Sequence, residues 1–404
     1  MNILYLCDEY PPGRHGGIGT SVRLLARQMV KLGHKVVVAG LYGPGYGGED
    51  EFFDEGVNVY RFRRGYDFDF LANEESLISR IAIRFLMDSG LLQCDITKNL
   101  AVYQNKLEDI IKKHGIDIIE MPDYNDYVRF CKSFVPFPQL PVPVVVKMNG
   151  TNTYFKNEAS QFVPQHILKM EQAILNQAKA VSSASKYTAD KSALYLSYNK
   201  HITVLYNGID TNIPAANIIK KSRQVIFTGT LVEKKGIYQL AKAWNIIVKA
   251  IPDARLLVLG KGPRQKVTSY LNVDAQPSVI FKGHVATNEL YSFLQESAIS
   301  IFPSYAEAFA LAPLEAMACG TAVINSNRTS GPELMEDETS GLLIDPDNVE
   351  QIASSIIHLL NNPDVCTRLA KNGYERVKER FEISKIAQEN LAFYQKVLDN
   401  TGQI

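Results

Sequence analysis

Short apolar segments alternate with amphipathic helical segments along this chain, and the alternation starts again at Arg223. It begins with an apolar segment at residues 2–7, a helical segment at 18–33 and a second apolar segment at 35–40. A strand, a helix and a strand at this spacing form the βαβ unit of a parallel sheet. The sequence therefore predicts an α/β fold, and the restart at Arg223 predicts that this fold occurs twice.

The predicted architecture is two Rossmann-like, doubly wound domains that face each other across a cleft. Open α/β sheets bind ligands at the carboxyl ends of their strands, so we expect the functional site in that cleft. The first domain is placed at residues 1–208 and the second at 209–383, and the last helix, at about 384–404, is free to pack back on the first domain. Residues 66–108 are predicted to be a mainly helical insertion. The other expected strands are 57–62, 116–120, 142–148, 179–182 and 201–205 in the first domain, and 223–229, 254–260, 278–283, 298–303, 321–326 and 341–344 in the second.

Composition narrows the class of protein. The 404 residues are 46% hydrophobic and 21% charged, which is typical of a globular chain long enough for two domains. A formal net charge of +0 argues against a nucleic-acid-binding protein, because such proteins carry a basic excess. The five cysteines are scattered and form no C-x-x-C pair, which favours a cytoplasmic location over a disulfide framework or a zinc site. We find neither a signal-peptide pattern nor an apolar run of about 20 residues, so we expect a soluble or peripheral protein.

Residues 9–20 form a glycine-rich loop between the first strand and the first helix. Gly16 and Gly17 allow a ligand to approach the backbone, and the following helix N-terminus presents N–H groups that favour an anion such as a diphosphate. The loop lacks the G-x-G-x-x-G pattern of dinucleotide sites. Two interpretations stay open here: a phosphate contact, or glycines that only form a tight turn.

A second loop follows the expected strand 298–303 and carries two glutamates. Glu307 is expected in the loop and Glu315 in the first turn of the next helix, with the amides of residues 309–311 between them. Carboxylates accept hydrogen bonds from vicinal diols, and a nest of amides binds phosphates, so this arrangement suits a nucleotide sugar. Taken alone, Glu315 has a simpler interpretation as a partner of the helix dipole, and Glu307 as a solvated loop residue.

Residues 304–345 resemble the signature of the family 4 retaining glycosyltransferases, which have the GT-B fold. Glu307 and Glu315 match the E-x7-E motif of that family. The resemblance extends over the whole chain through five further segments in the family order: Gly16-Gly17-Ile18-Gly19, Leu205-Tyr206-Asn207-Gly208-Ile209-Asp210, Gly260-Lys261-Gly262-Pro263, Gly331-Pro332-Glu333 and Ser340-Gly341-Leu342-Leu343.

The resemblance implies a role for each matching residue. Residues 1–208 become the acceptor side and residues 209–383 the donor domain. Glu307 would hold hydroxyls of the transferred sugar, and Glu315 the ribose diol. The G-R-L-x-x-x-K-G segment of the family aligns with residues 229–236, so Lys235 would hold the diphosphate. The catalytic set is then Glu307, Lys235 and Asn149, and the donor-binding set is Gly16, Gly17, Thr230, Lys235, Gly260, Glu307, Phe309, Ala310, Leu311 and Glu315.

Two positions depart from the family pattern. Thr230 stands where the family usually has a phosphate-binding arginine, and Lys261, Arg328, His284 and Arg14 are the candidates to replace it. Asn149 stands where the family commonly has a histidine, and an amide can bind a sugar hydroxyl but cannot carry a proton. The donor phosphate or another residue must therefore take the acceptor proton.

Three residues near the first loop, Asp8, Arg14 and His15, are candidates to orient the acceptor, and each has a solvated interpretation as well. The histidines show no metal-ligand spacing, so no metal and no cofactor is predicted. Arginines and aromatic or aliphatic residues are interleaved at 61–85, which fits either contact with an anionic membrane or an amphipathic helix with its arginines in water. The interleaved residues are Arg61, Arg63, Arg64, Arg80 and Arg84 with Phe62, Phe68, Phe70, Leu77, Ile81 and Phe85.

The predicted function is a retaining glycosyltransferase that moves a sugar from a nucleotide diphosphate sugar, with a UDP-sugar as the working hypothesis, to a hydroxyl acceptor. The acceptor is expected to be a glycan or glycolipid precursor, and the location to be cytoplasmic or on the inner face of the membrane. Two alternatives stay open: a nucleotide-sugar epimerase of the same fold, and a nucleotide-sugar-binding protein without activity.

Overall fold

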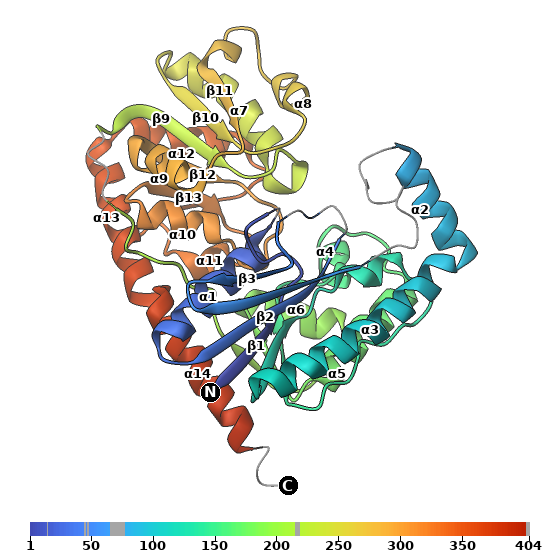
Figure 1. The fold of residues 1–404 in the computed structure, drawn as a ribbon. Helices are drawn as coiled ribbons and strands as arrows, with labels where there is room; N and C mark the ends of the chain where they lie inside the picture. Colours follow the sequence, from blue (N-terminus) through green and yellow to red (C-terminus); the bar gives the residue numbers. More distant parts are fainter. Residues whose placement is uncertain (14, 44–45, 47, 65–76, 215–218, 401–404) are drawn as a thin grey trace. The chain divides into compact units, whose positions relative to one another are not determined.

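The computed structural model describes residues 1–13, 15–43, 46, 48–64, 77–214 and 219–400, with the backbone alone at Leu77 and Arg80. The chain folds into two compact units. The first unit is Met1–Gly208 together with Ile383–Ile404, and the second is Ile209–Glu382. Each unit is built on one sheet (Figure 1).

The sheet of the first unit has eight strands in the order β3-β4-β2-β1-β5-β6-β7-β8. Neighbouring strands run parallel except β3 and β4, which are antiparallel. The strands are β1 (Asn2–Leu6), β2 (Lys35–Tyr42), β3 (Glu51–Asp54), β4 (Val57–Arg63), β5 (Ile118–Pro122), β6 (Val144–Met148), β7 (Ala180–Ser183) and β8 (Ile202–Val204).

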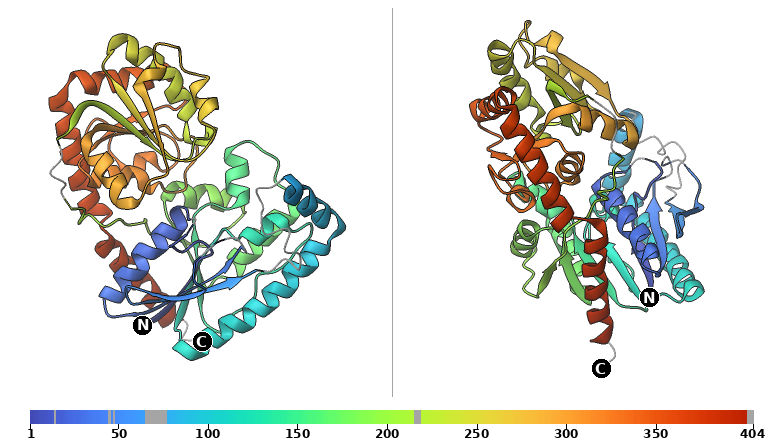
Figure 2. Two further views of the ribbon diagram at one scale, coloured as in Figure 1. Left: turned by 45° about the horizontal axis from the view of Figure 1, so that its top comes forward. Right: turned by 90° about the vertical axis from the view of Figure 1, so that its left-hand side faces the viewer.

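Helices cover both faces of this sheet (Figures 1 and 2). Side chains alternate along a strand, so Leu4 and Leu6 of β1 join one core with α3 and α5, while Ile3 and Tyr5 join the opposite core with α1 and α14. The helices are α1 (Gly17–Lys31), α2 (Leu77–Ser89), α3 (Leu91–His114), the 3-10 helix η2 (Asp126–Phe130), α4 (Asn152–Glu158), α5 (Gln165–Gln177), α6 (Lys186–Tyr195) and α14 (Ile383–Asp399).

The C-terminal helix α14 belongs to the first unit and packs beside α1 (Figure 2). Tyr394 of α14 is fully buried and donates a hydrogen bond of 2.7 Å from its hydroxyl to Glu120 Oε2 in β5. The Tyr394 hydroxyl also lies 3.4 Å from the hydroxyl of Tyr5. A polar contact inside an apolar core thus fixes the last helix to the middle of the sheet.

The sheet of the second unit has six parallel strands in the order β11-β10-β9-β12-β13-β14. The strands are β9 (Lys221–Thr228), β10 (Arg255–Leu259), β11 (Val279–Gly283), β12 (Ser297–Phe302), β13 (Ala322–Ser326) and β14 (Leu342–Ile344). The helices are η3 (Glu233–Lys235), α7 (Ile237–Ala250), α8 (Arg264–Thr268), η4 (Gln276–Ser278), α9 (Thr287–Glu296), α10 (Leu311–Ala318), α11 (Gly331–Leu334), α12 (Val349–Asn361) and α13 (Pro363–Arg380).

The core of the second unit lies between its sheet and the helices α7 and α12. Trp244 of α7 is fully buried there, and its indole N–H donates to the Ser278 hydroxyl at 2.8 Å. The residues Val225, Phe227, Ile299 and Ile301 supply the sheet side of this core.

The predicted fold class of two doubly wound α/β sheets is confirmed. The sequence reasoning missed β3, a four-residue edge strand that runs antiparallel to β4 and leaves Phe53 70% exposed. Within the predicted insertion, α2 and α3 are helices as expected, and the part of 66–108 that precedes Leu77 is outside the described residues.

Candidate functional site

The strand order of the second unit reverses between β9 and β12. The chain runs from β9 through β10 to β11 on one side and from β12 through β13 to β14 on the other. The loops that follow β9 and β12 therefore diverge at the carboxyl edge of the sheet, which is where open α/β sheets bind ligands. Lys235 follows β9 and Glu307 follows β12, so both are at this edge.

Backbone contacts hold these two loops against each other. The Tyr305 N–H donates to the Lys234 carbonyl at 2.8 Å. Gly236 has a φ of 70°, and a Cβ at this position would lie 1.8 Å from the Pro303 carbonyl oxygen. Only glycine fits this conformation and this approach, so Gly236 is what allows Lys235 to stand beside the β12 loop.

Lys235 and Glu307 form an ion pair in which Lys235 Nζ lies 2.5 Å from Glu307 Oε1. Burial alone would raise the pKa of Glu307. The charges of Lys235 and Lys234 and a hydrogen bond from Ser304 outweigh that effect and hold the pKa of this carboxyl below its usual value. Glu307 is therefore a carboxylate at neutral pH, able to accept hydrogen bonds from hydroxyl groups.

Glu315 has a different environment. Helix α10 begins at Leu311, so Glu315 lies in its second turn, and the expectation of a first-turn position was wrong. The carboxyl has no hydrogen-bond or ion-pair partner among the described residues, and burial raises its pKa to about 7. This placement argues against a role as a helix-dipole partner, and it leaves a half-buried acceptor available to a ligand.

The amides expected to meet a phosphate lie at the N-terminus of α10. Ala310 is the N-cap and Leu311 the first helical residue. The side chains of Phe309 and Leu311 are buried, with the Phe309 ring 5.9 Å from that of Phe381. The first N–H groups of a helix have no acceptor within the helix.

Thr230 and Gly260 follow the neighbouring strands β9 and β10. Thr230 is exposed. Gly260 has a φ of 150°, and a Cβ there would lie 1.8 Å from the Gly229 carbonyl oxygen, so the two loops run in direct contact. The structure thus brings Thr230, Lys235, Gly260, Glu307 and the start of α10 to one edge of the second unit.

In the first unit, the glycine loop leads into α1. Gly16 is the N-cap and Gly17 is the first helical residue. Apart from its chain neighbours and the backbone of its own helix, no atom of the described residues lies within 4 Å of a Cβ built on Gly17. The sequence reasoning missed Glu9, whose Oε1 accepts a hydrogen bond of 2.7 Å from the Gly19 N–H. One N–H of this helix terminus is therefore already used by a carboxylate of the chain, while the space beside Gly17 is open.

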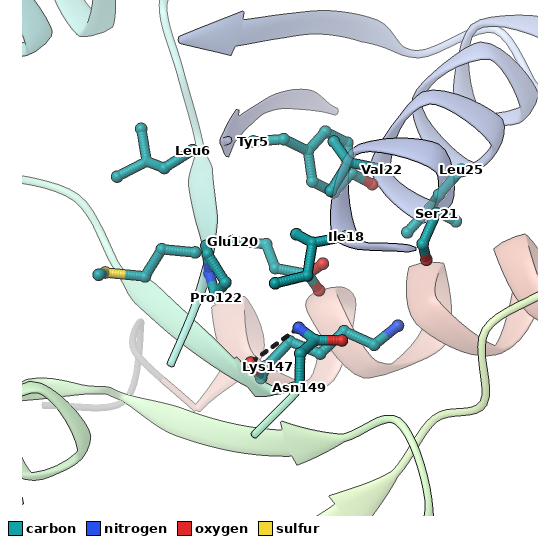
Figure 3. Close-up of a pocket in the computed structure, with 11 residues that line it drawn as sticks. Tyr5, Leu6, Ile18, Ser21, Val22, Leu25, Glu120, Pro122, Lys147 and Asn149 are labelled. Carbon is teal, nitrogen blue, oxygen red and sulfur yellow. Dashed lines mark hydrogen bonds between the residues drawn. The ribbon is translucent and has the colours of Figure 1, made fainter. Parts of the chain in front are cut away.

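A small pocket lies where the strand order of the first unit reverses, between β1 and β5, under α1 (Figure 3). Its free space of about 10 Å³ is about what one water molecule needs. Lys147 is 4% exposed, and within the described part of the chain its ammonium group has no hydrogen-bond or ion-pair partner. Burial lowers the pKa of Lys147 and raises that of Glu120, and the two side chains line the same pocket.

Asn149 follows β6 and lines this pocket. Its side-chain amide donates to the Lys147 carbonyl at 3.2 Å, as the dashed line in Figure 3 marks. The buried carboxylate of Asp123 accepts from the Asn149 and Gly150 N–H groups at 2.8 and 3.2 Å. Burial raises the pKa of Asp123 to about 7. Asp123 is a positioning residue that the sequence reasoning missed.

The candidate acceptor residues are placed differently. Asp8 accepts from the Leu41 N–H at 2.8 Å, so it supports β2, and burial raises its pKa to about 6. His15 is exposed, with Nδ1 2.8 Å from the Gly13 carbonyl oxygen. Arg14 lies outside the described residues.

The arginines of the interleaved segment do not form one surface. Arg61 is 2% exposed and donates to the carbonyls of Tyr10 and Pro12, at 2.8 and 2.6 Å. Arg63 pairs with Asp50 at 2.5 Å and Arg64 with Asp126 at 2.7 Å. Neither of the two interpretations holds for these three arginines, because Arg61 and Arg63 lie in strand β4, Arg64 follows it, and all three have partners within the fold.

Apolar side chains of α2 are nevertheless exposed. Ile78, Ile81 and Phe85 are 75%, 63% and 68% exposed, and their spacing places them on one face of the helix. Arg84 is exposed beside them, while the side chains of Leu77 and Arg80 and all of Phe68 and Phe70 lie outside the described residues. Among the described residues, no helix has the length and hydropathy to cross a bilayer, and no three His, Cys, Asp or Glu side chains gather as metal ligands.

Two family models match adjoining parts of the chain. Residues 15–213 match the model described as Glycosyltransferase Family 4, and residues 208–376 match Glycosyl transferases group 1. The glycogen synthase of Mycobacterium tuberculosis is 23% identical over 409 residues, covering 98% of this chain and 94% of the relative.

Solved structures show the same fold over the full length. The sucrose-phosphate synthase of Thermosynechococcus elongatus superposes with a TM-score of 0.74 at 20% identity, covering 99% of this chain and 100% of that one. HepE of Anabaena, in complex with UDP-glucose, has a TM-score of 0.62 at 15% identity and covers 100% of both chains. The chain belongs to the family 4 glycosyltransferases, retaining hexosyltransferases of GT-B fold that take the sugar from a nucleotide-sugar donor.

Proposed function

We propose that the second unit binds a UDP-sugar at the carboxyl edge of its sheet and transfers the sugar to a hydroxyl of a glycan or glycolipid precursor. The observation that carries the proposal is the Lys235–Glu307 ion pair at the point where the strand order reverses, with Glu315 unpartnered among the described residues on the adjoining helix. Such a set offers a cation for phosphate and two carboxylates for hydroxyls, which matches the chemistry of a nucleotide sugar.

Each group has a separate task. The carboxylate of Glu307 accepts hydrogen bonds from hydroxyls of the transferred sugar, and Glu315 accepts them from the ribose diol. The ammonium group of Lys235 and the amides at the start of α10 bind the diphosphate. Leu311 and Phe309 contribute only their backbone, because their side chains are buried.

The difficult step is the departure of the diphosphate, which gains negative charge while the sugar becomes an oxocarbenium-like cation. Cations and amides that are already fixed in place stabilise that charge without having to reorganise. Asn149 cannot take a proton, so a phosphate oxygen of the donor takes the proton of the acceptor hydroxyl. Attack from the phosphate side is consistent with the retained configuration of the family.

The acceptor is assigned to the first unit, at the carboxyl edge where Gly17 and Asn149 lie. The support is the open space beside Gly17 and the firm placement of Asn149 by Asp123. Because Asp8 already supports β2, Asn149 is a stronger candidate than Asp8 for contact with the acceptor.

The choice of a UDP-sugar rests on the relatives. HepE of Anabaena was solved in complexes with UDP and with UDP-glucose. The test is a panel of UDP-, GDP- and ADP-sugars, scored first by thermal shift and then by release of nucleoside diphosphate in the presence of candidate acceptors. UDP-sugars are expected to stabilise the protein most, and stabilisation by another class alone would overturn the choice of base.

Two alternative activities are separated by the same assay. An epimerase converts its nucleotide sugar without an acceptor, and a protein that only binds releases no nucleoside diphosphate. A transferase releases it in proportion to the glycosylated product, and the Glu307→Ala variant loses that turnover. Family membership favours transfer over both alternatives.

Contact with a membrane is the second part of the proposal, supported by the exposed apolar face of α2. Wild-type protein is expected to sediment with vesicles of phosphatidylglycerol more than with vesicles of phosphatidylcholine, since Arg84 adds positive charge beside the apolar face. The double variant Ile81→Ser, Phe85→Ser should remain in the supernatant. Equal sedimentation of the variant, or none by either protein, would contradict this part.

A further inference from the structure

The two lysines at the end of β9 both act on Glu307: Lys235 pairs with this carboxylate, and the charge of Lys234 helps to lower its pKa. Lys235 is already paired with Glu307 at 2.5 Å, and position 230 is the neutral Thr230. A diphosphate carries more than one negative charge, and each needs a fixed partner as the leaving group departs. A neighbouring loop can supply a further cation for these charges.

Arg328 is not that cation. Its Nη2 donates to Asp345 Oδ1 at 2.7 Å and to Asp347 Oδ2 at 2.5 Å, and its guanidinium lies 5.4 Å from the ring centre of Tyr305. Two carboxylates already neutralise this side chain. Recruiting it for a phosphate would leave both of them without a partner.

The loop after β10 is the loop adjacent to Thr230. The Gly229 N–H donates to the Leu259 carbonyl at 2.9 Å, and the Leu231 N–H donates to the Lys261 carbonyl at 2.8 Å. Thr230 thus lies between Gly229 and Leu231, whose N–H groups donate to the end of β10 and to the loop that follows it. His284, which follows β11, is one strand farther away.

Glycines on both sides of Lys261 bring this loop close. A Cβ on Gly260 would lie 1.8 Å from the Gly229 carbonyl oxygen, and one on Gly262 would lie 2.7 Å from Leu231 Cβ. Gly260 and Gly262 also have φ values of 150° and 143°, which other residues rarely adopt. The backbone of Lys261 is therefore fixed beside Thr230.

The side chain of Lys261 is exposed, and within the described residues its ammonium group has no hydrogen-bond or ion-pair partner. A lysine is a long, flexible point charge suited to phosphate. We propose that Lys261 supplies the cation for the donor diphosphate next to Thr230. The inference rests on the proposed donor site, and it adds a specific phosphate-binding residue from a different strand.

The test measures by calorimetry the affinity of the protein for a nucleoside diphosphate and for the corresponding nucleoside. UDP with uridine is the first pair, followed by GDP with guanosine and ADP with adenosine. Lys261→Met removes the charge and keeps the length of the side chain. Lys249→Met, an exposed lysine in the last turn of α7, is the matched control. A third variant adds Thr230→Arg to Lys261→Met.

Lys261→Met is expected to lower the affinity for the diphosphate by about 10- to 100-fold, because one charge-assisted contact is lost. Its affinity for the nucleoside should fall by less than about twofold. Thr230→Arg should recover most of that loss, and the Lys249 control should bind as the wild type does. Unchanged diphosphate affinity, or an equal loss for diphosphate and nucleoside, would overturn the role of Lys261. If the wild type binds none of the three diphosphates, the proposed donor site is refuted, and the role of Lys261 is refuted with it.

Discussion

Replacing Lys235 by methionine separates the contribution of this residue to the fold from its contribution to catalysis. The Lys235 side chain is 30% exposed and that of Glu307 is 18% exposed. The pair is less exposed than a surface ion pair, and its loss leaves a partly buried carboxylate without that partner, which costs about 1–2 kcal/mol of folding free energy. The melting temperature of the variant should therefore fall by about 2–8 °C.

The effect on the reaction is expected to be larger. Loss of one charge-assisted contact to the diphosphate costs about 1.5–3 kcal/mol, and at about 1.4 kcal/mol for each factor of ten this slows transfer by about 10- to 150-fold. Because the charge on the leaving group grows in the transition state, most of the loss should appear in kcat rather than in KM.

The assay is release of nucleoside diphosphate at saturating and at limiting donor, with Lys235→Arg and Lys249→Met beside the variant. The arginine variant keeps the charge and should retain part of the rate, and the Lys249 control should match the wild type. A Lys235→Met enzyme within about threefold of the wild-type rate would refute the assignment of Lys235 to the diphosphate.

Four further predictions concern three residues fixed by the structure. Because the pKa of Glu315 is about 7 and its charged form is the better diol acceptor, donor affinity should rise between pH 6 and pH 8 in the wild type and stay flat in Glu315→Gln, as calorimetry can measure. Burial raises the pKa of Glu315 in the folded protein above that in the unfolded chain, so the wild type loses folding free energy as pH rises between these two pKa values. Glu315→Gln lacks this loss, and it should melt at a higher temperature than the wild type at pH 8 but not at pH 5. Gly236→Ala should slow transfer strongly, measured as diphosphate release, because the new methyl group meets the Pro303 carbonyl and separates the Lys235 and Glu307 loops. Tyr394→Phe leaves buried Glu120 without its hydroxyl donor, which should cost about 1–3 kcal/mol in denaturant unfolding, and an unchanged midpoint would contradict the anchoring of α14.

The fold could be predicted from the sequence because buried parallel strands and amphipathic helices leave a strong local pattern. The edge strand β3 left none, since its four residues include an exposed Phe53 and it pairs with β4 in the opposite direction. Glu315 was expected in the first turn and lies in the second, because Pro313 suggested a helix start two residues after the true one at Leu311.

Residues that act through distant contacts left no local pattern. Glu9 accepts a hydrogen bond from Gly19 only because the glycine loop folds back on itself. Asp123 supports Asn149 across two neighbouring strands, β5 and β6. Arg61, for which contact with a membrane was one of two interpretations, is buried among backbone carbonyls and lies over the Phe52 ring at 4.6 Å. Such partners are brought together by tertiary structure, which spacing along the chain does not specify.

A crystal structure with UDP bound tests the central claim most directly. We predict the diphosphate at the edge formed by Lys235, Lys261 and the N-terminus of α10, with the ribose hydroxyls within about 3 Å of the Glu315 carboxylate. Electron density for the nucleotide at any other place, with Glu315 still without a partner, would contradict it.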